Sequence, residues 1–124
     1  MRTSPARGRW AEDQALRFLT CAGMRLLARN VRQGGGEIDL VLEDGHTLVF
    51  VEVKARRKSA GRAAEAVTLA KQGRIASAAS VWLARNGVPA GGCRFDVVTV
   101  AGTGPDLAVE HIPGAFDAPA RPGI

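Results

Sequence analysis

The order of apolar patterns along the sequence predicts an α/β domain in which helices pack on a mixed β-sheet. Apolar residues recur at helical spacing over Trp10–Ala22 and again from Thr68 to about Asn86. Between these helices, and after the second, shorter segments alternate apolar and polar residues as strands do. The length of 124 residues fits one domain with one sheet.

The first half of the chain is predicted to run from helix to strand to loop. A basic lead, residues 1–9, precedes the helix, which stops at Gly23. Met24–Val31 is predicted as the first strand. Gly34, Gly35 and Gly36 follow it, and such a run lets the backbone turn sharply or approach a ligand closely.

A β-hairpin is predicted next, from two strands over Glu37–Glu43 and Leu48–Lys54. Asp44-Gly45 between them is typical of a two-residue turn. That turn would place Glu43 opposite His46. The same register would place Asp39 opposite Phe50 and Glu37 opposite Glu52.

This hairpin is expected to gather charged side chains on one face. Directly opposed residues share a face, and strand side chains repeat their direction every second residue. Asp39, Glu52 and Lys54 should therefore converge on one surface, while Val51 and Val53 point to the other. A register slip of one residue would separate Asp39 from Glu52.

The second half begins with a helix that Thr68 can cap and Gly87 ends. Its inward side is expected to carry Leu69, Ile75, Ala79, Trp82 and Leu83. Arg94–Val100 is predicted as a strand and Leu107–Ile112 as an edge strand. We therefore expect one domain over residues 10–116, followed by a Pro- and Gly-rich tail, 117–124, that is disordered.

The charge balance favours a polyanionic partner. The chain carries 17 Lys and Arg residues against 12 Asp and Glu residues, a formal charge of +5. Nucleic acid is the first candidate, although a basic surface also serves simple solubility. No apolar run is long enough for a membrane span and the N-terminus lacks a signal peptide's apolar stretch, so we expect a cytoplasmic protein without a membrane partner.

Two carboxylates and a lysine on neighbouring strands suit phosphodiester hydrolysis. Asp39, Glu52 and the backbone carbonyl of Val53 are expected to hold Mg²⁺ or Mn²⁺, since Mg²⁺ prefers oxygen ligands and needs few from the protein. The ammonium of Lys54 would orient the attacking water or offset charge in the transition state. An acid and a lysine two apart also occur by chance, but charges within so apolar a strand need partners or a function.

Several other residues leave alternatives open. Glu37 could be a further ligand or could face solvent at the mouth of its strand. A basic cluster after the second hairpin strand is expected to contact phosphates, the alternative being a solvated face; it consists of Arg56, Arg57, Lys58 and Arg62. Lys71 fits either role equally. Asp96 is expected to pair with Arg94 or another basic residue and to be structural.

The spacing of Asp39 and Glu52-Val53-Lys54 resembles the PD-(D/E)xK nuclease motif, with Glu37-Ile38 in place of the motif's proline. Longer runs resemble the bacterial YraN family, which is classed with endonucleases, over about Gly8 to Phe116. These runs are Gly36–Val41, Val49–Lys54 and Arg94–Val98, with Ala11-Glu12, Asn30, Lys71 and His111–Phe116 beside them.

The resemblance implies a restriction-endonuclease-like core, similar to that of archaeal Holliday-junction resolvases, with a bound divalent metal. Relatives of the resolvase type often carry an acid on a helix near the metal. Glu12 lies among apolar residues of its helix, where an idle carboxylate is costly, and we expect it to be a further catalytic and metal-binding residue.

Two functions follow as hypotheses. The first is a Mg²⁺-dependent endonuclease, a phosphodiesterase that acts on DNA, with branched DNA among the candidate substrates and RNA still open. The second is a non-catalytic nucleic-acid-binding module in a recombination, repair or DNA-uptake assembly. Symmetric cutting of two strands needs two sites, so the first hypothesis is compatible with a homodimer.

Overall fold

The computed structural model describes residues 5–56 and 67–117. In this part of the chain two long helices and five strands follow the expected order: a helix, three strands, a helix and two strands. They are α1 (Pro5–Cys21), β1 (Arg25–Gln33), β2 (Gly36–Asp44), β3 (Thr47–Arg56), α2 (Leu69–Asn86), β4 (Cys93–Ala101) and β5 (Ala108–Phe116). A short 3₁₀ turn, Gly104–Asp106, precedes β5. Neither long helix combines the length and apolar character that crossing a membrane requires.

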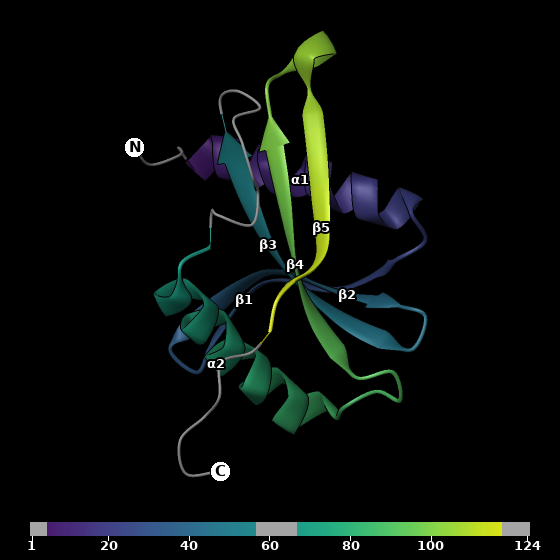
Figure 1. Ribbon diagram of the computed structural model, residues 1–124, viewed down its shortest axis with the longest axis vertical. Helices are drawn as coiled ribbons and strands as arrows, with labels where there is room; N and C mark the ends of the chain where they lie inside the picture. Colours follow the sequence, from purple (N-terminus) through teal and green to yellow (C-terminus); the bar gives the residue numbers. More distant parts are fainter. Residues whose placement is uncertain (1–4, 57–66, 118–124) are drawn as a thin grey trace.

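The five strands form one mixed sheet in the order β1-β2-β3-β4-β5 (Figure 1). Strands β3 and β4 are parallel, and every other neighbouring pair is antiparallel. A parallel pair needs a long crossover connection, and α2 lies on the connection from β3 to β4. This is the predicted α/β fold, consistent with a restriction-endonuclease-like core.

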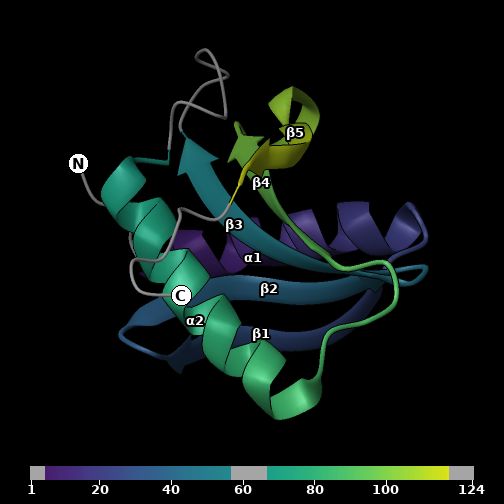
Figure 2. The same ribbon diagram turned by 60° about the horizontal axis from the view of Figure 1, so that its bottom comes forward.

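Each helix covers one face of the sheet and closes a core of its own (Figure 2). Ala11, Ala15 and Leu19 of α1 pack with alternate valines and leucines of β2, β3 and β4. On the other face, Ile75 and Ala79 of α2 pack with residues that include Phe50. Because both faces are covered, any charged side chain in the central strands must find partners inside the protein.

Several element bounds differ from the predicted ones. Helix α1 begins at Pro5 rather than Trp10, because proline at the first helical position has a preset φ and lacks only an amide that would be unpaired there. Strand β5 continues to Phe116, beyond the predicted Ile112. Thr68 caps α2 as predicted, but Leu69 is exposed rather than inward because it starts the helix beyond the sheet. The predicted disorder of the tail falls mainly on residues 118–124, which lie outside the described residues.

The predicted hairpin register was wrong by two residues. Asp44 pairs with Thr47 and Leu42 with Val49, so the turn is Gly45-His46 instead of Asp44-Gly45. Gly45 has φ +61°, which suits the first position of this turn. An even shift keeps the paired residues Leu40–Asp44 and Thr47–Val51 on their predicted faces, so Glu52 and Lys54 still share a face.

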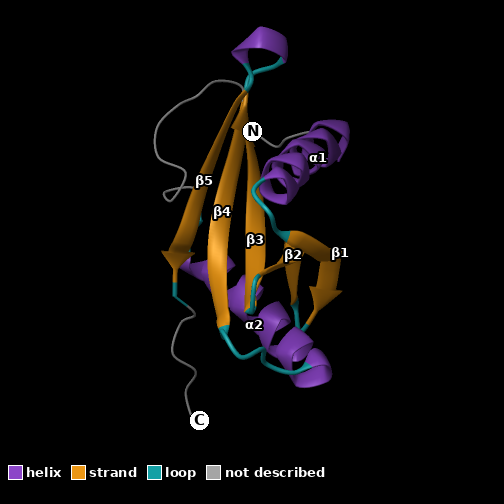
Figure 3. Cartoon of the chain, turned by 90° about the vertical axis from the view of Figure 1, so that its right-hand side faces the viewer, coloured by secondary structure: helices purple, strands orange, loops and turns teal. Residues whose placement is uncertain are grey.

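The glycine turn between β1 and β2 approaches the backbone of α2, not a ligand. A Cβ atom on Gly36 would lie 1.9 Å from the carbonyl oxygen of Arg74, and one on Gly34 would lie 2.8 Å from that of Ser77. The hydroxyl of Ser77 also donates a hydrogen bond to the carbonyl of Gly34. Absent side chains at this turn therefore let α2 lie against the β1–β2 ribbon (Figure 3).

Substitution Gly36→Ala should lower the free energy of unfolding by about 3 kcal/mol, because the new methyl group meets backbone that cannot move independently. Gly35→Ala is the matched control, since Gly35 has φ +76° but open space around it and should cost only about 1 kcal/mol of backbone strain. Urea unfolding measures both variants. Equal losses would show that close packing on α2 is not what requires glycine here.

Candidate metal and phosphate site

The candidate site lies where the central sheet forks. Pairing between β2 and β3 ends at Leu40 and Val51, whereas β3 continues to Arg56 beside β4. Just beyond this point, the backbone N–H of Val53 donates a 2.7 Å hydrogen bond to the Asp39 carboxylate instead of joining a β2 ladder. The fork thus replaces main-chain pairing between β2 and β3 with a contact from the Asp39 side chain.

Asp39 occupies an irregular position of β2. Its neighbours Ile38 and Leu40 belong to the cores on opposite faces of the sheet, although residues two apart on a regular strand share a face. The β1 pairs on either side place Asn30 opposite Asp39, and Asn30 has φ +51°. Asparagine tolerates this left-handed conformation better than most residues. The irregularity turns Asp39 toward the fork, and Asn30 is a contributor that sequence reasoning had not assigned a role.

Glu52 is the buried centre of the site. Its side chain is 4% exposed, and it lies on the same face of β3 as Phe50 and Lys54. Two ammonium groups approach the same oxygen, Oε2: that of Lys71 at 2.5 Å and that of Lys54 at 3.5 Å. The predicted proximity of Glu52 and Lys54 is confirmed, and Lys71 joins them from α2.

The N-terminus of α2 fixes where Lys71 starts. The side chain of Thr68 accepts a hydrogen bond from the backbone N–H of Lys71, which caps the helix in its first turn. The ion pair with Glu52 comes in addition to the two expected roles of Lys71, phosphate contact or a solvated face, and the phosphate contact stays a prediction. The sequence carried a weak signal for its partner, because a charge in a strand as apolar as β3 requires a counter-charge.

The charged groups of this site shift one another's pKa values. Burial, and next the charge of Glu52, raise the pKa of Asp39 well above its ordinary value, although the Val53 hydrogen bond opposes this. Burial also lowers the pKa of Lys54. The Lys71 ammonium lowers this pKa further, whereas the charge of Glu52 raises it. For Lys71, burial would lower the pKa, but the hydrogen bond and charge of Glu52 outweigh it and raise the pKa. Burial and the like charge of Glu52 thus disfavour ionisation of Asp39, while the two lysines balance charge on Glu52.

Glu12 lies on α1. Its charge is the smallest of the influences that raise the pKa of Asp39, a long-range effect rather than a contact. Burial in turn raises the pKa of Glu12, against a hydrogen bond from Asn30 and the charge of Arg29. Arg29 lies 3.5 Å from Glu12 Oε1, an oxygen that is buried and lacks a hydrogen-bond partner among the described residues.

The other expected site residues are less informative. Arg57, Lys58 and Arg62 lie outside the described residues, so their predicted phosphate contacts stay predictions. Arg56 ends β3, close in sequence to the fork. Glu37 is 43% exposed and lies 3.5 Å from Arg32, which favours the solvent-facing alternative over a ligand role.

The donor set fits a hard divalent cation held by few protein ligands. Within residues 5–56 and 67–117, no three His, Cys, Asp or Glu side chains form a group that could hold a metal ion, so Glu12 is not assembled as a third carboxylate ligand. Burial first, and next the charge of Glu52, raise the pKa of Asp39, and a cation between the two carboxylates would offset both effects. Mg²⁺ accepts one or two carboxylates with water in its remaining positions.

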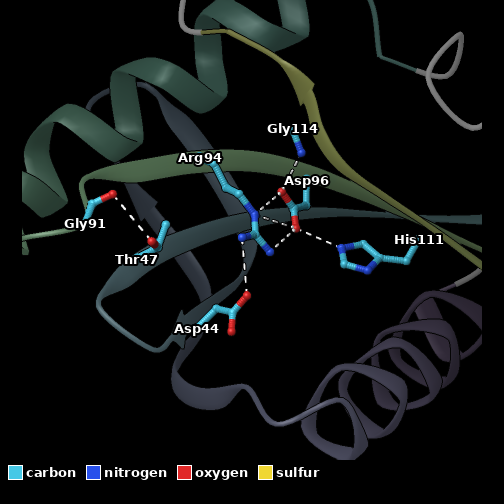
Figure 4. Close-up of polar contacts among 7 residues, drawn as sticks. All are labelled: Asp44, Thr47, Gly91, Arg94, Asp96, His111 and Gly114. Carbon is cyan, nitrogen blue, oxygen red and sulfur yellow. Dashed lines mark hydrogen bonds and ion pairs between the residues drawn. The ribbon is translucent and has the colours of Figure 1, made fainter.

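A second buried acid lies apart from this site. Asp96 is fully buried on β4, and by strand alternation it faces the α1 side, opposite to Glu52. Figure 4 shows its carboxylate between Arg94, whose Nε lies at 3.0 Å, and His111, whose Nε2 lies at 2.8 Å; the backbone N–H of Gly114 donates at 2.9 Å. The expected Arg94 pair is confirmed. His111 and Gly114 complete a satisfied structural cluster that ties β5 to β4.

These features define an α/β domain with an acidic and lysine-rich site at a fork in its sheet. Residues 11–100 match the Uncharacterised protein family UPF0102. The chain is 53% identical over 114 residues to the UPF0102 protein of Symbiobacterium thermophilum, covering 90% of this chain and 96% of that one. It is also 48% identical to relatives from Chromohalobacter salexigens, covering 93% of this chain and 94% of the relative, and from Frankia casuarinae, covering 94% and 100%. The chain belongs to the UPF0102 family, which confirms the YraN resemblance at the level of the family.

Asp39→Asn should stabilise the metal-free protein at neutral pH. The pKa of Asp39 is higher in the folded than in the unfolded chain, so the folded state binds more protons and loses stability as the pH rises from the ordinary Asp pKa through the raised one. Asparagine removes this charge while its amide oxygen can still accept from Val53. In EDTA at neutral pH we expect a gain of about 1 kcal/mol, fading toward pH 4 and below, by urea unfolding. A variant less stable at neutral than at acidic pH, relative to wild type, would contradict the charge repulsion.

Asp96→Asn should have the opposite effect. Removing the charge takes from the Arg94 guanidinium its buried partner but leaves Asp44 at 3.3 Å, so we expect a loss of about 2 kcal/mol. Asp106→Asn, in the exposed 3₁₀ turn, is the control and should change little. Urea unfolding at neutral pH compares the two variants, and an unchanged Asp96→Asn protein would refute the structural role.

Proposed function

We propose that this protein is a metal-dependent endonuclease-type phosphodiesterase acting on nucleic acid, with DNA as the preferred substrate and branched DNA as a candidate form of it. One observation carries the proposal: Asp39 and Glu52, from two different strands, meet at the sheet fork with Lys54 beside them. Apolar strands rarely bury two mutually repelling acids beside a lysine unless the group has a function. The net positive charge suits a polyanionic substrate.

Asp39, Glu52 and the carbonyl of Val53 are the residues that would hold Mg²⁺ or Mn²⁺. When bound, such an ion polarises a phosphate and lowers the pKa of a coordinated water. The Val53 N–H holds the Asp39 carboxylate in place from the outset, so this ligand needs no reorganisation. Glu12 adds a small electrostatic influence on Asp39, although Arg29 pairs with it and it is not placed as a third ligand among the described residues.

Lys54 performs the remaining chemistry in this proposal. It is partly exposed, so its ammonium can donate to a phosphate oxygen or an attacking water at the opening of the fork. A positioned cation of this kind offsets the negative charge that gathers on the phosphoryl oxygens during displacement. Its lowered pKa also brings proton transfer closer to neutral pH than for an ordinary lysine.

The competing function is a nucleic-acid-binding module that cleaves nothing. One observation favours it: the two ammonium groups on Glu52 neutralise that carboxylate without any metal ion. Such a module would act within a recombination, repair or DNA-uptake assembly. Cleavage and binding must therefore be measured on the same variants.

Purified protein should cleave labelled DNA only when Mg²⁺ or Mn²⁺ is present, and Asp39→Ala and Lys54→Met should each lower the rate at least about 100-fold. Linear, single-stranded, flap and four-way-junction DNA, and a matching RNA, would rank the substrates. Glu110→Gln, an exposed acid on edge strand β5, is the control and should cleave as wild type does. Binding of DNA by all four proteins without cleavage by any would instead establish the binding module.

A further inference from the structure

Lys71 has a position that the proposed chemistry does not use. It makes the shorter of the two ion pairs with Glu52, 2.5 Å against 3.5 Å for Lys54, and both lysines approach Oε2. Oε2 belongs to a carboxylate that the proposed function assigns to a divalent cation. The Lys71 ammonium therefore stands where it competes directly with that cation.

The surroundings of Lys71 allow it to leave. Its backbone is fixed by the Thr68 cap, whereas its side chain is 36% exposed along its length to the ammonium that contacts Glu52. Lysine carries a flexible four-carbon stem and a point charge that can move between partners. Glu52, by contrast, is 4% exposed on a central strand and cannot turn toward water. A competition between two cations for Glu52 would thus be resolved by movement of Lys71.

We propose that Lys71 is a resident counter-cation that occupies Glu52 in the metal-free protein and is displaced when a divalent cation binds. Metal binding then releases the ammonium at the mouth of the site, where it is available to a phosphate of the substrate. By linkage, anything that holds Lys71 away from Glu52 tightens metal binding, so phosphate and metal bind cooperatively. In this role Lys71 regulates metal binding, and the inference rests on the proposed metal site.

Two opposing predictions separate this role from a supporting one. If Lys71 competes with the metal, its removal strengthens metal binding; if Lys71 helps to build the site, its removal weakens metal binding. Loss of one positive charge anywhere nearby also strengthens cation binding slightly. Arg74→Met supplies that baseline, because Arg74 is an exposed cation one turn further along the same helix.

Calorimetric titration of Mn²⁺ into wild type, Lys71→Met, Lys71→Arg, Arg74→Met and Asp39→Asn tests the inference. We expect Lys71→Met to bind Mn²⁺ at least about fivefold more tightly than both wild type and Arg74→Met. Lys71→Arg keeps the charge and should stay near wild type. Asp39→Asn should lose the binding.

The outcomes separate this inference from the proposed function. Equal or weaker Mn²⁺ binding by Lys71→Met, with binding lost in Asp39→Asn, overturns the role of Lys71 and leaves the metal site standing. Absence of Mn²⁺ binding in both wild type and Lys71→Met overturns the two together. Binding that appears only in Lys71→Met supports the competition in its strongest form.

A measurement on the wild-type chain covers the case in which Lys71→Met folds poorly. The ¹⁵Nζ signal of Lys71 should be protected from exchange in EDTA, because the ammonium is held by Glu52, and should lose that protection as Mg²⁺ is added. A Lys71 signal that stays protected at saturating Mg²⁺ would contradict displacement.

Discussion

The arrangement of this protein depends on the burial of one carboxylate, that of Glu52, in the central strand of the sheet. An isolated buried charge would cost several kcal/mol, so the fold must supply opposite charge where water cannot reach. It does so from two directions, with Lys54 two residues further along β3 and Lys71 in the first turn of α2. The crossover between the parallel strands carries α2, and the cap of α2 fixes the position from which Lys71 reaches Glu52.

The second carboxylate, that of Asp39, adds a negative charge beside the ion pairs of Glu52, so the site favours a further cation. Asp39 lies near enough to Glu52 for their charges to repel, and the backbone hydrogen bond from Val53 counters only part of the effect. Contrast this with Asp96, which is equally internal but is surrounded by an arginine, a histidine and a backbone amide. Asp96 has partners for its charge, whereas Asp39 is buried beside a like charge. Unfavourable burial of this kind is typical of functional sites.

The sequence predicted the hairpin face correctly although it predicted the register wrongly, because side-chain direction depends only on whether a residue is odd or even along the strand. It predicted Asp39, Glu52 and Lys54 together for the same reason. It could not predict that Lys71 would reach Glu52, since that contact depends on how α2 crosses the sheet, and this is set by the glycine turn packing on Arg74 and Ser77. Asn30 was also beyond reach, because its left-handed backbone is visible only in three dimensions.

The central claim is that Asp39 and Glu52 together hold a divalent cation, and crystals soaked in Mn²⁺ test it most directly. Anomalous scattering locates manganese independently of any assumption about ligands. The account predicts a peak between the two carboxylates, next to the Val53 carbonyl, with the Lys71 ammonium no longer on Glu52. Manganese bound elsewhere, or excluded from the fork at high concentration while Lys71 stays in place, would contradict it.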